Sequence, residues 1–160
     1  MAGNQIPVTV LGAEMLKEEL HRLRSEDRPN VIQAISEARE QGDLSENAEY
    51  EAAKEKQSFI EGRISELESK LSNLQIIDPK RLNAEGRVVF GATVRFEDLE
   101  SGDSKIYQIV GEDEANIKGG KISIASPIAR ALIGKSEGDI AEVMAPGGVK
   151  EYEILDVSYH

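Results

Sequence analysis

Apolar residues between Ala53 and Leu74 recur at alternating spacings of four and three residues. The apolar members of this series are Ala53, Ile60, Ile64, Leu67, Leu71 and Leu74, and the polar Gln57 fills one further position. Such a heptad pattern, with charged residues between its members, is typical of a helix in a coiled coil. It predicts one helix over residues 46–75, about 45 Å long. This helix needs a partner for its apolar seam, and Gln57 is interpreted as a polar position that sets the register.

The partner helix is predicted over residues 12–41, where the apolar stripe has two parts. The first part is Leu16, Leu20 and Leu23, and the second is Val31, Ile35 and Ala38. The second part is displaced by one position, and the displacement falls close to Pro29. Asp27 or Arg28 could precede a restarted helix that has Pro29 in its first turn. We therefore expect one long helix with a kink or a break near Pro29.

The connection between the two helices, residues 42–47, is predicted to form the tip of an antiparallel hairpin. Gly42 suits the end of the first helix, because glycine tolerates a positive φ. Asp43 or Ser45 can cap the second helix, with Glu46 near its start. Small residues on both sides, such as Ala38 and Ala53, predict a hairpin that narrows toward this tip.

Asp43 and Glu46 are the candidate chemical groups of the tip. One interpretation is helix capping, since acidic side chains in a first turn interact favourably with the helix dipole. The other is a Mg²⁺ site, because Mg²⁺ is often held by one or two carboxylates together with phosphates and waters. Two carboxylates alone make a weak site, so this interpretation requires that the metal be shared with whatever the tip enters.

The pattern changes after Asp78, and Pro79 stops any helix that arrives from upstream. Alternating or apolar runs predict strands at residues 92–96, 106–110, 121–124 and 152–157, and Gly147-Gly148 suits a hairpin turn before the last of them. One short helix is predicted between Ser126, as its cap, and Gly134, as its stop. The fold class is therefore α+β: an antiparallel coiled-coil hairpin in residues 1–77, then a small domain in residues 78–160 with a mostly antiparallel sheet and one helix.

Charge and composition exclude several functions. The net charge of −11 disfavours direct binding of nucleic acid and of anionic membranes. The chain has no Cys and only two His, far apart, which excludes a disulfide framework, a thiol nucleophile and a Cys-ligated zinc and makes a His-based metal site or a Ser-His triad improbable. No apolar run reaches the roughly 18 residues of a spanning helix, and the N-terminus lacks the pattern of a signal peptide. These features lead us to expect a cytoplasmic protein without a membrane partner.

The tip sequence also carries a resemblance. Residues 38–50, AREQGDLSENAEY, and residues 126–135, SPIARALIGK, resemble the GreA/GreB family of bacterial transcript cleavage factors, and the resemblance covers essentially the whole chain. It implies a non-enzymatic elongation factor whose coiled coil enters the secondary channel of RNA polymerase. There, Asp43 and Glu46 would help to hold a catalytic Mg²⁺ and orient a water, so that the polymerase cleaves backtracked RNA and arrested complexes are rescued. No metal is expected on the free protein.

The same resemblance assigns further roles. Arg39 and Lys54 would face the RNA 3′ end, although each also fits an ordinary solvated charge on a helix. Gly42, Asn47 and Tyr50 would position the tip, and for Asn47 and Tyr50 contact with the polymerase or simple packing are equally open. The second domain would be FKBP-like and dock on the polymerase through Ser126, Pro127, Ile128, Ala129 and Arg130. Ser45 departs from relatives that have a basic residue there, which favours the branch of the family that releases short fragments. The hairpin satisfies its own seam, so we expect a monomer.

Three other functions compete with this one. An FKBP-like domain suggests a prolyl isomerase or chaperone, but such pockets are lined with aromatic residues and this chain has 4%. A related channel-binding factor could inhibit cleavage, but Asp43 and Glu46 are intact with no additional acids between them. A plain coiled-coil adaptor would explain the two helices, but it would not explain their small residues and acidic tip.

Overall fold

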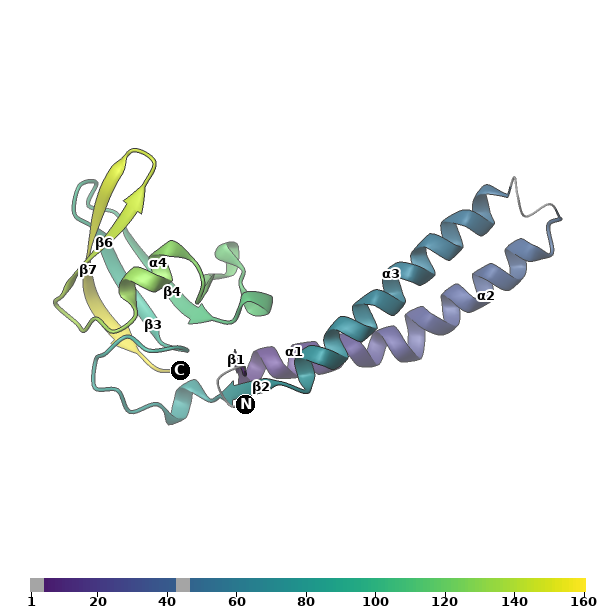
Figure 1. The fold of residues 1–160 in the computed structure, drawn as a ribbon. Coiled ribbons are helices and arrows are strands. Elements are labelled where there is room, and N and C mark those ends of the chain that lie inside the picture. The colour runs from purple at the N-terminus through teal and green to yellow at the C-terminus, as the bar shows by residue number, and fades with distance from the viewer. Residues whose placement is uncertain (1–4, 43–46) are drawn as a thin grey trace. The chain divides into compact units, whose positions relative to one another are not determined.

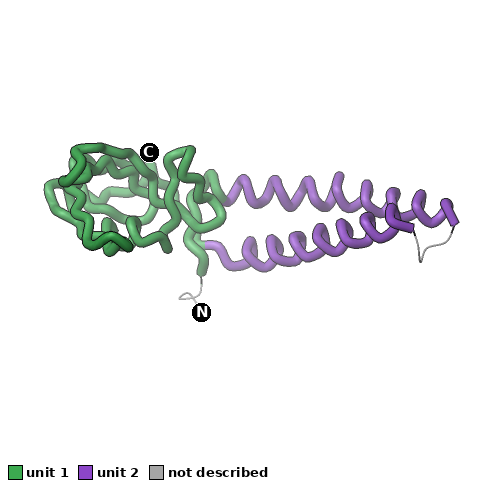
Figure 2. The backbone as a smooth tube through the Cα atoms, turned by 90° about the horizontal axis from the view of Figure 1, so that it is seen from above, with its two compact units in different colours: residues 1–12, 75–160 green, residues 13–74 purple. Residues whose placement is uncertain are grey.

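A computed structural model of the protein describes residues 5–42 and 47–160. It divides the chain into two compact units, here called the hairpin unit, Ala13–Leu74, and the globular unit, Met1–Gly12 with Gln75–His160 (Figure 2). The sequence boundary at residue 77 therefore differs from the spatial division. The reason is that strand β1 (Ile6–Thr9) pairs with strand β2 (Leu74–Ile77), so the start of the chain joins the C-terminal unit.

The hairpin is confirmed: its first arm is α1 (Val10–Arg22) followed by α2 (Arg28–Arg39), and its second is α3 (Ala48–Leu71) (Figure 1). The predicted seam residues form one buried cluster of Leu16, Leu20, Leu23, Val31, Ile60, Ile64 and Leu67. One end of the prediction is wrong, because α3 stops at Leu71 and Leu74 begins β2. The run Leu-Gln-Ile-Ile finds a strand partner in β1, and this pairing overrides the continued helical spacing.

A π-helical turn, Leu23–Asp27, joins α1 to α2. The Arg28 N–H donates to the Leu23 carbonyl, five residues back, so this turn holds one residue more than an α-helical turn. That extra residue explains why Val31 follows Leu23 by eight positions and yet faces the same seam. The first arm is therefore widened at this turn and not broken, and Asp27 makes no side-chain cap there.

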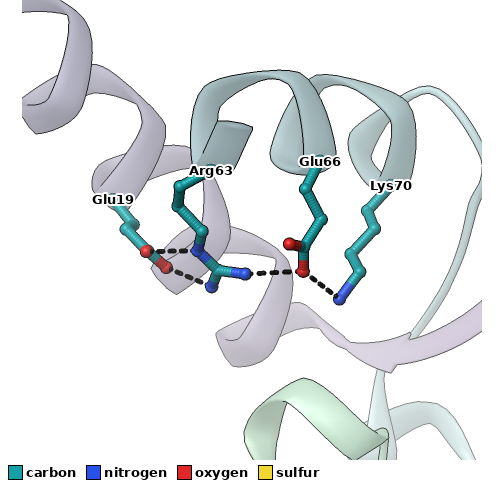
Figure 3. A network of polar contacts seen from close by, with 4 residues as sticks. All are labelled: Glu19, Arg63, Glu66 and Lys70. Atoms are coloured by element: carbon teal, nitrogen blue, oxygen red, sulfur yellow. Dashed lines mark hydrogen bonds and ion pairs between the residues drawn. The ribbon is translucent and has the colours of Figure 1, made fainter. Parts of the chain in front are cut away.

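Ion pairs join the helices beside the seam. The Arg63 guanidinium of α3 donates to both carboxylate oxygens of Glu19 in α1, at 2.7 and 2.8 Å, and a third N–H reaches Glu66, which also pairs with Lys70 (Figure 3). Arg28 makes a second two-bond contact, with Glu61, and Arg24 contacts Glu68 at 2.7 Å. The pairs therefore join the first arm to α3 before the π-helical turn at Glu19, within it at Arg24 and after it at Arg28.

The globular unit contains a five-stranded sheet in the order β5-β4-β3-β7-β6, antiparallel except between β4 and β5. The strands are β3 (Thr93–Asp98), β4 (Ser104–Val110), β5 (Lys121–Ser123), β6 (Ile140–Ala145) and β7 (Gly148–Ser158). Helix α4 (Pro127–Leu132) places Ala129 and Leu132 in the core against this sheet. The predicted strands, helix and hairpin turn are confirmed, and β6 is a strand that the sequence reading did not identify.

Within residues 5–42 and 47–160, no helix combines the length and the apolar character that crossing a bilayer requires.

Candidate functional site

The two predicted tip acids, Asp43 and Glu46, lie outside the described residues, as does Ser45. The structure describes the residues that border them, and among these Gly42 ends the first arm. The Gln41 N–H donates to the Ala38 carbonyl at 3.2 Å, and Gly42 then takes a φ of +107°. A Cβ at Gly42 would meet no atom within 4 Å, so the backbone conformation and not space favours glycine here.

Asn47 begins the second arm and is bonded to both helices. Its side-chain oxygen accepts from the Tyr50 N–H at 3.0 Å, which caps α3, and its side-chain nitrogen donates to the Ala38 carbonyl at 2.7 Å, near the end of α2. Both helix ends leave backbone groups without intrahelical partners, and one amide side chain serves one group at each end. The N-cap of α3 is therefore Asn47, whereas Asp43 and Ser45, the two predicted caps, lie outside the described residues.

Arg39 and Tyr50 lie next to Asn47. The Arg39 guanidinium stands over the Tyr50 ring, 5.9 Å from its centroid, an arrangement in which the ring face attracts the cation. This contact joins α2 to α3 one residue beyond Ala38. Tyr50 is therefore in contact with the end of α2. Its role in positioning the tip, which the family resemblance implied, stays a prediction.

Arg39 and Lys54 line one shallow groove. The groove has a volume of about 230 Å³, and its other walls are Ile32, Ile35, Ser36 and Gln57. The Lys54 ammonium donates to the Gln57 side-chain oxygen at 3.2 Å. Both residues belong to α3, so this hydrogen bond of Gln57 does not join the two arms. The structure thus brings together the two cationic residues that the sequence predicted to face RNA, although they are 15 positions apart.

No group of three or more His, Cys, Asp or Glu among the described residues could hold a metal ion. The two predicted ligands, Asp43 and Glu46, are outside that part of the chain. As a donor set, two carboxylates suit Mg²⁺ when the remaining ligands are supplied by water, by phosphate or by another protein.

The second predicted site, Ser126–Arg130, is mainly a helix start. The Ser126 hydroxyl accepts from the Ala129 N–H at 3.2 Å, and Ala129 is 0% exposed in the core. Ala129 therefore has no surface to offer a partner, and its predicted docking role is wrong. Pro127 and Arg130 are exposed, and Ser126 and Ile128 are partly exposed, so docking by this segment depends on those four residues.

The sequence pattern places Asn47 near the tip, but it does not reveal that the Asn47 side chain is hydrogen-bonded to both α2 and α3. The available signal was its position, directly before the helical run that starts at Ala48, where Asn is a favoured cap. Asp43 and Ser45 are equally good caps on that criterion, so the chain pattern alone does not choose among the three.

Comparison with known proteins is consistent along the chain. A family model described as "Transcription elongation factor, N-terminal" matches residues 6–76, and one described as "Transcription elongation factor, GreA/GreB, C-term" matches residues 83–159. Transcription elongation factor GreA of Neisseria meningitidis serogroup B is 68% identical over 155 residues, 97% of this chain and 98% of that protein. The GreA of Ralstonia nicotianae is 66% identical over 154 residues, 96% and 98% of the two chains.

A solved structure, GreA factor homolog 1 (Gfh1) of Thermus thermophilus, is 32% identical, covers 96% of this chain and 99% of that chain, and has a TM-score of 0.43. The two family models and the GreA relatives confirm the resemblance seen in residues 38–50 and 126–135, because those matches extend over both units. With two family models covering nearly all of its length and relatives at about two thirds identity, this chain belongs to the GreA/GreB family of transcription elongation factors.

Proposed function

We propose that this protein acts on RNA polymerase in the cytoplasm as a monomer, and that its hairpin enters the secondary channel and stimulates the polymerase's own cleavage of backtracked RNA. The observation that carries the proposal is the arrangement around the tip. Asn47 ties the ends of α2 and α3 together, and Arg39 and Lys54 share a groove beside them. The residues that border Asp43 and Glu46 are thus held in place, with cations available for an RNA backbone.

In this proposal Asp43 and Glu46 are the ligands that the protein adds to a Mg²⁺ shared with the polymerase. The bound metal would supply a Lewis acid and an activated water for in-line attack on a phosphodiester. The protein's own residues do the positioning: Asn47 and Tyr50 fix the arms, and Arg39 and Lys54 orient the RNA 3′ segment through its phosphates. Hydrolysis remains the polymerase's reaction, so the protein is an activator and not an enzyme.

The test is a cleavage assay on backtracked polymerase with RNA labelled in its 3′ segment and Mg²⁺ present. Asp43→Asn and Glu46→Gln each keep the size of the side chain and remove its charge. We expect each to reduce the cleavage rate by roughly a hundredfold, the scale seen when a group that stabilises the transition state is lost. Both variants should still compete with the parent protein for the polymerase.

The matched control is Glu49→Gln, which removes an equal charge from the first turn of α3. Because Glu49 has no place in the proposed metal site, this variant should cleave within about twofold of the parent, as expected for a surface change. Equal activity of parent, Asp43→Asn and Glu46→Gln would show that the metal role of the tip acids is wrong.

A further inference from the structure

A buried carboxylate in the globular unit belongs to no part of the tip. Glu114 lies at the end of the short 3₁₀ turn Glu112–Glu114 and is only 6% exposed. It accepts three hydrogen bonds: from the Thr9 N–H at 3.0 Å, from the Gly111 N–H at 3.0 Å, and from the Thr9 hydroxyl. Burial of an acidic group is costly unless such donors are present. The site is therefore built around Glu114.

Thr9 carries this connection into helix α1. Thr9 is 4% exposed and directly precedes the helix, and its hydroxyl oxygen accepts from the Gly12 N–H at 3.1 Å. This is the bond of an N-cap residue to the third position of its helix. One hydroxyl thus donates to Glu114 and accepts from the first turn of α1. Through it the start of the helix is bonded to a loop 105 residues away in sequence.

Two glycines make room for the carboxylate. A Cβ at Gly12 would lie 2.2 Å from the carboxyl carbon and one oxygen of Glu114, and a Cβ at Gly111 would lie 2.6 Å from the Pro7 carbonyl oxygen. Both distances are far inside van der Waals contact. At these two positions the requirement for glycine is space, and the close approach of the β1 segment to the Gly111–Glu114 loop depends on it.

Both connections between the globular unit and the hairpin unit involve the segment that Glu114 contacts. The first connection is α1, which leaves the globular unit after Gly12. In the second connection the chain returns through β2, which is paired with β1, and the last residue of β1 is Thr9. Glu114 is therefore bonded to the end of the strand that lies beside both connections.

We propose that Glu114 is a positioning residue for transcript cleavage. Its hydrogen bonds to Thr9 and Gly111 make the first turn of α1 part of the globular unit. When the globular unit docks on the polymerase, the start of the helix that leads to the tip is then fixed as well. This inference rests on the proposed function and adds a requirement to it. Glu114 touches neither RNA nor metal, and acts only by removing freedom from the start of the helix. A displacement of about 1 Å at a reacting centre can reduce a rate by two orders of magnitude, so loss of this anchor should be visible in the rate.

The test uses the full-length protein with Gly12→Ala, Glu114→Ala and the double variant. Alanine at position 12 should push the carboxylate out of its site, and Glu114→Ala removes the carboxylate itself. We expect each to lower the cleavage rate at saturating protein by roughly tenfold, with the half-saturating concentration unchanged. Because both variants remove the same contact, the double variant should be no worse than either one.

Two controls separate this role from general destabilisation. Gly62→Ala is the matched glycine substitution, since Gly62 is inside α3 and a Cβ there meets nothing within 4 Å, and it should leave cleavage unchanged. Glu114→Gln keeps one oxygen for the Thr9 and Gly111 N–H groups and should retain most of the activity. Amide exchange should quicken at Thr9, Gly12 and Gly111 in the two alanine variants and not in these controls.

The outcomes are distinct. Parent-like cleavage by Glu114→Ala and Gly12→Ala would overturn the inference and leave the proposed function standing. A loss confined to the half-saturating concentration, or additive losses in the double variant, would overturn it as well, because either result indicates a weakened fold and not a misplaced tip. Failure of the parent protein to stimulate any cleavage would instead refute the proposed function.

Discussion

The globular unit and the hairpin unit are each stabilised internally in a different way. In the globular unit a sheet and a helix enclose side chains from all directions, and residues such as Val94, Leu132 and Ile154 are completely buried. In the hairpin unit the two arms share one seam, and among its described residues Ile64 and Leu67 are fully buried, while Leu16 and Leu20 keep 5% and 8% of their surface exposed. A two-helix arm has too few layers to form a full core, so it adds ion pairs and a shared cap.

The largest expected difference between the two units is the loss of stability when a buried leucine is replaced by alanine. Leu132→Ala in the globular unit should reduce the free energy of unfolding by about 4 kcal/mol, because the surroundings of a fully buried leucine cannot collapse into the space. Leu20→Ala in the hairpin should cost about 2 kcal/mol, since solvent already reaches this position. Denaturant unfolding followed by amide exchange in each unit measures both values. Equal losses would contradict the view that the hairpin has the weaker core.

The caps of α3 and α4 give a smaller contrast. Ser126→Ala removes one hydrogen bond at the start of α4 and should cost about 1 kcal/mol. Asn47→Ala removes a bond to each arm of the hairpin and should cost about 2 kcal/mol. Asn47→Asp serves as the intermediate case, because it keeps the acceptor for Tyr50 and loses the donor to Ala38. Amide exchange at Tyr50 should then stay slow in the Asp variant and quicken in the Ala variant; the same rate in both would show that the bond to Ala38 is the dominant one.

The smallest expected difference is between the pKa values of two carboxylates, one in each unit. The pKa of Glu61 in the hairpin is lowered mainly by its hydrogen bond from Arg28, whereas the pKa of Asp98 in the globular unit is lowered first by the backbone N–H of Glu100. A lowered folded pKa means that each contribution to stability is present above the ordinary carboxyl range and is lost as the pH falls through the lowered value. NMR titration with Arg28→Gln should therefore raise the pKa of Glu61 and leave that of Asp98 unchanged.

High salt should distinguish the same two groups. Glu61 depends on an exposed cation, so screening at 1 M salt should move its pKa toward the ordinary value. Asp98 depends on fixed backbone N–H groups of a turn, and its pKa should move less. A larger response of Asp98 than of Glu61 would show that long-range charge, and not the local bonds, lowers these pKa values.

The sequence predicted the parts of the fold in which one local pattern decides the outcome. The seam was readable because spacing and burial coincide, and α4 because Ser126, Pro127 and Gly134 mark both its ends. The spacing of Leu74 fits a continued helix equally well, and only the pairing of β2 with β1 decides against it. The Glu114 site could not be read at all, since it joins segments 105 residues apart that share no local pattern. At the tip the sequence named the acids, and the structure added the bonds that hold their neighbours.

The π-helical turn has a consequence for chain length. Removing one residue between Arg24 and Asp27 would bring Leu23 and Val31 seven positions apart, and the two halves of the stripe would then continue as one uninterrupted heptad series on an ordinary α-helix. We therefore expect a first arm that is one residue shorter to present the same seam to α3. Insertions and deletions are normally tolerated in loops and not in coiled coils. In this hairpin we expect the wide turn to be the place at which the first arm can lose one residue while its seam still faces α3.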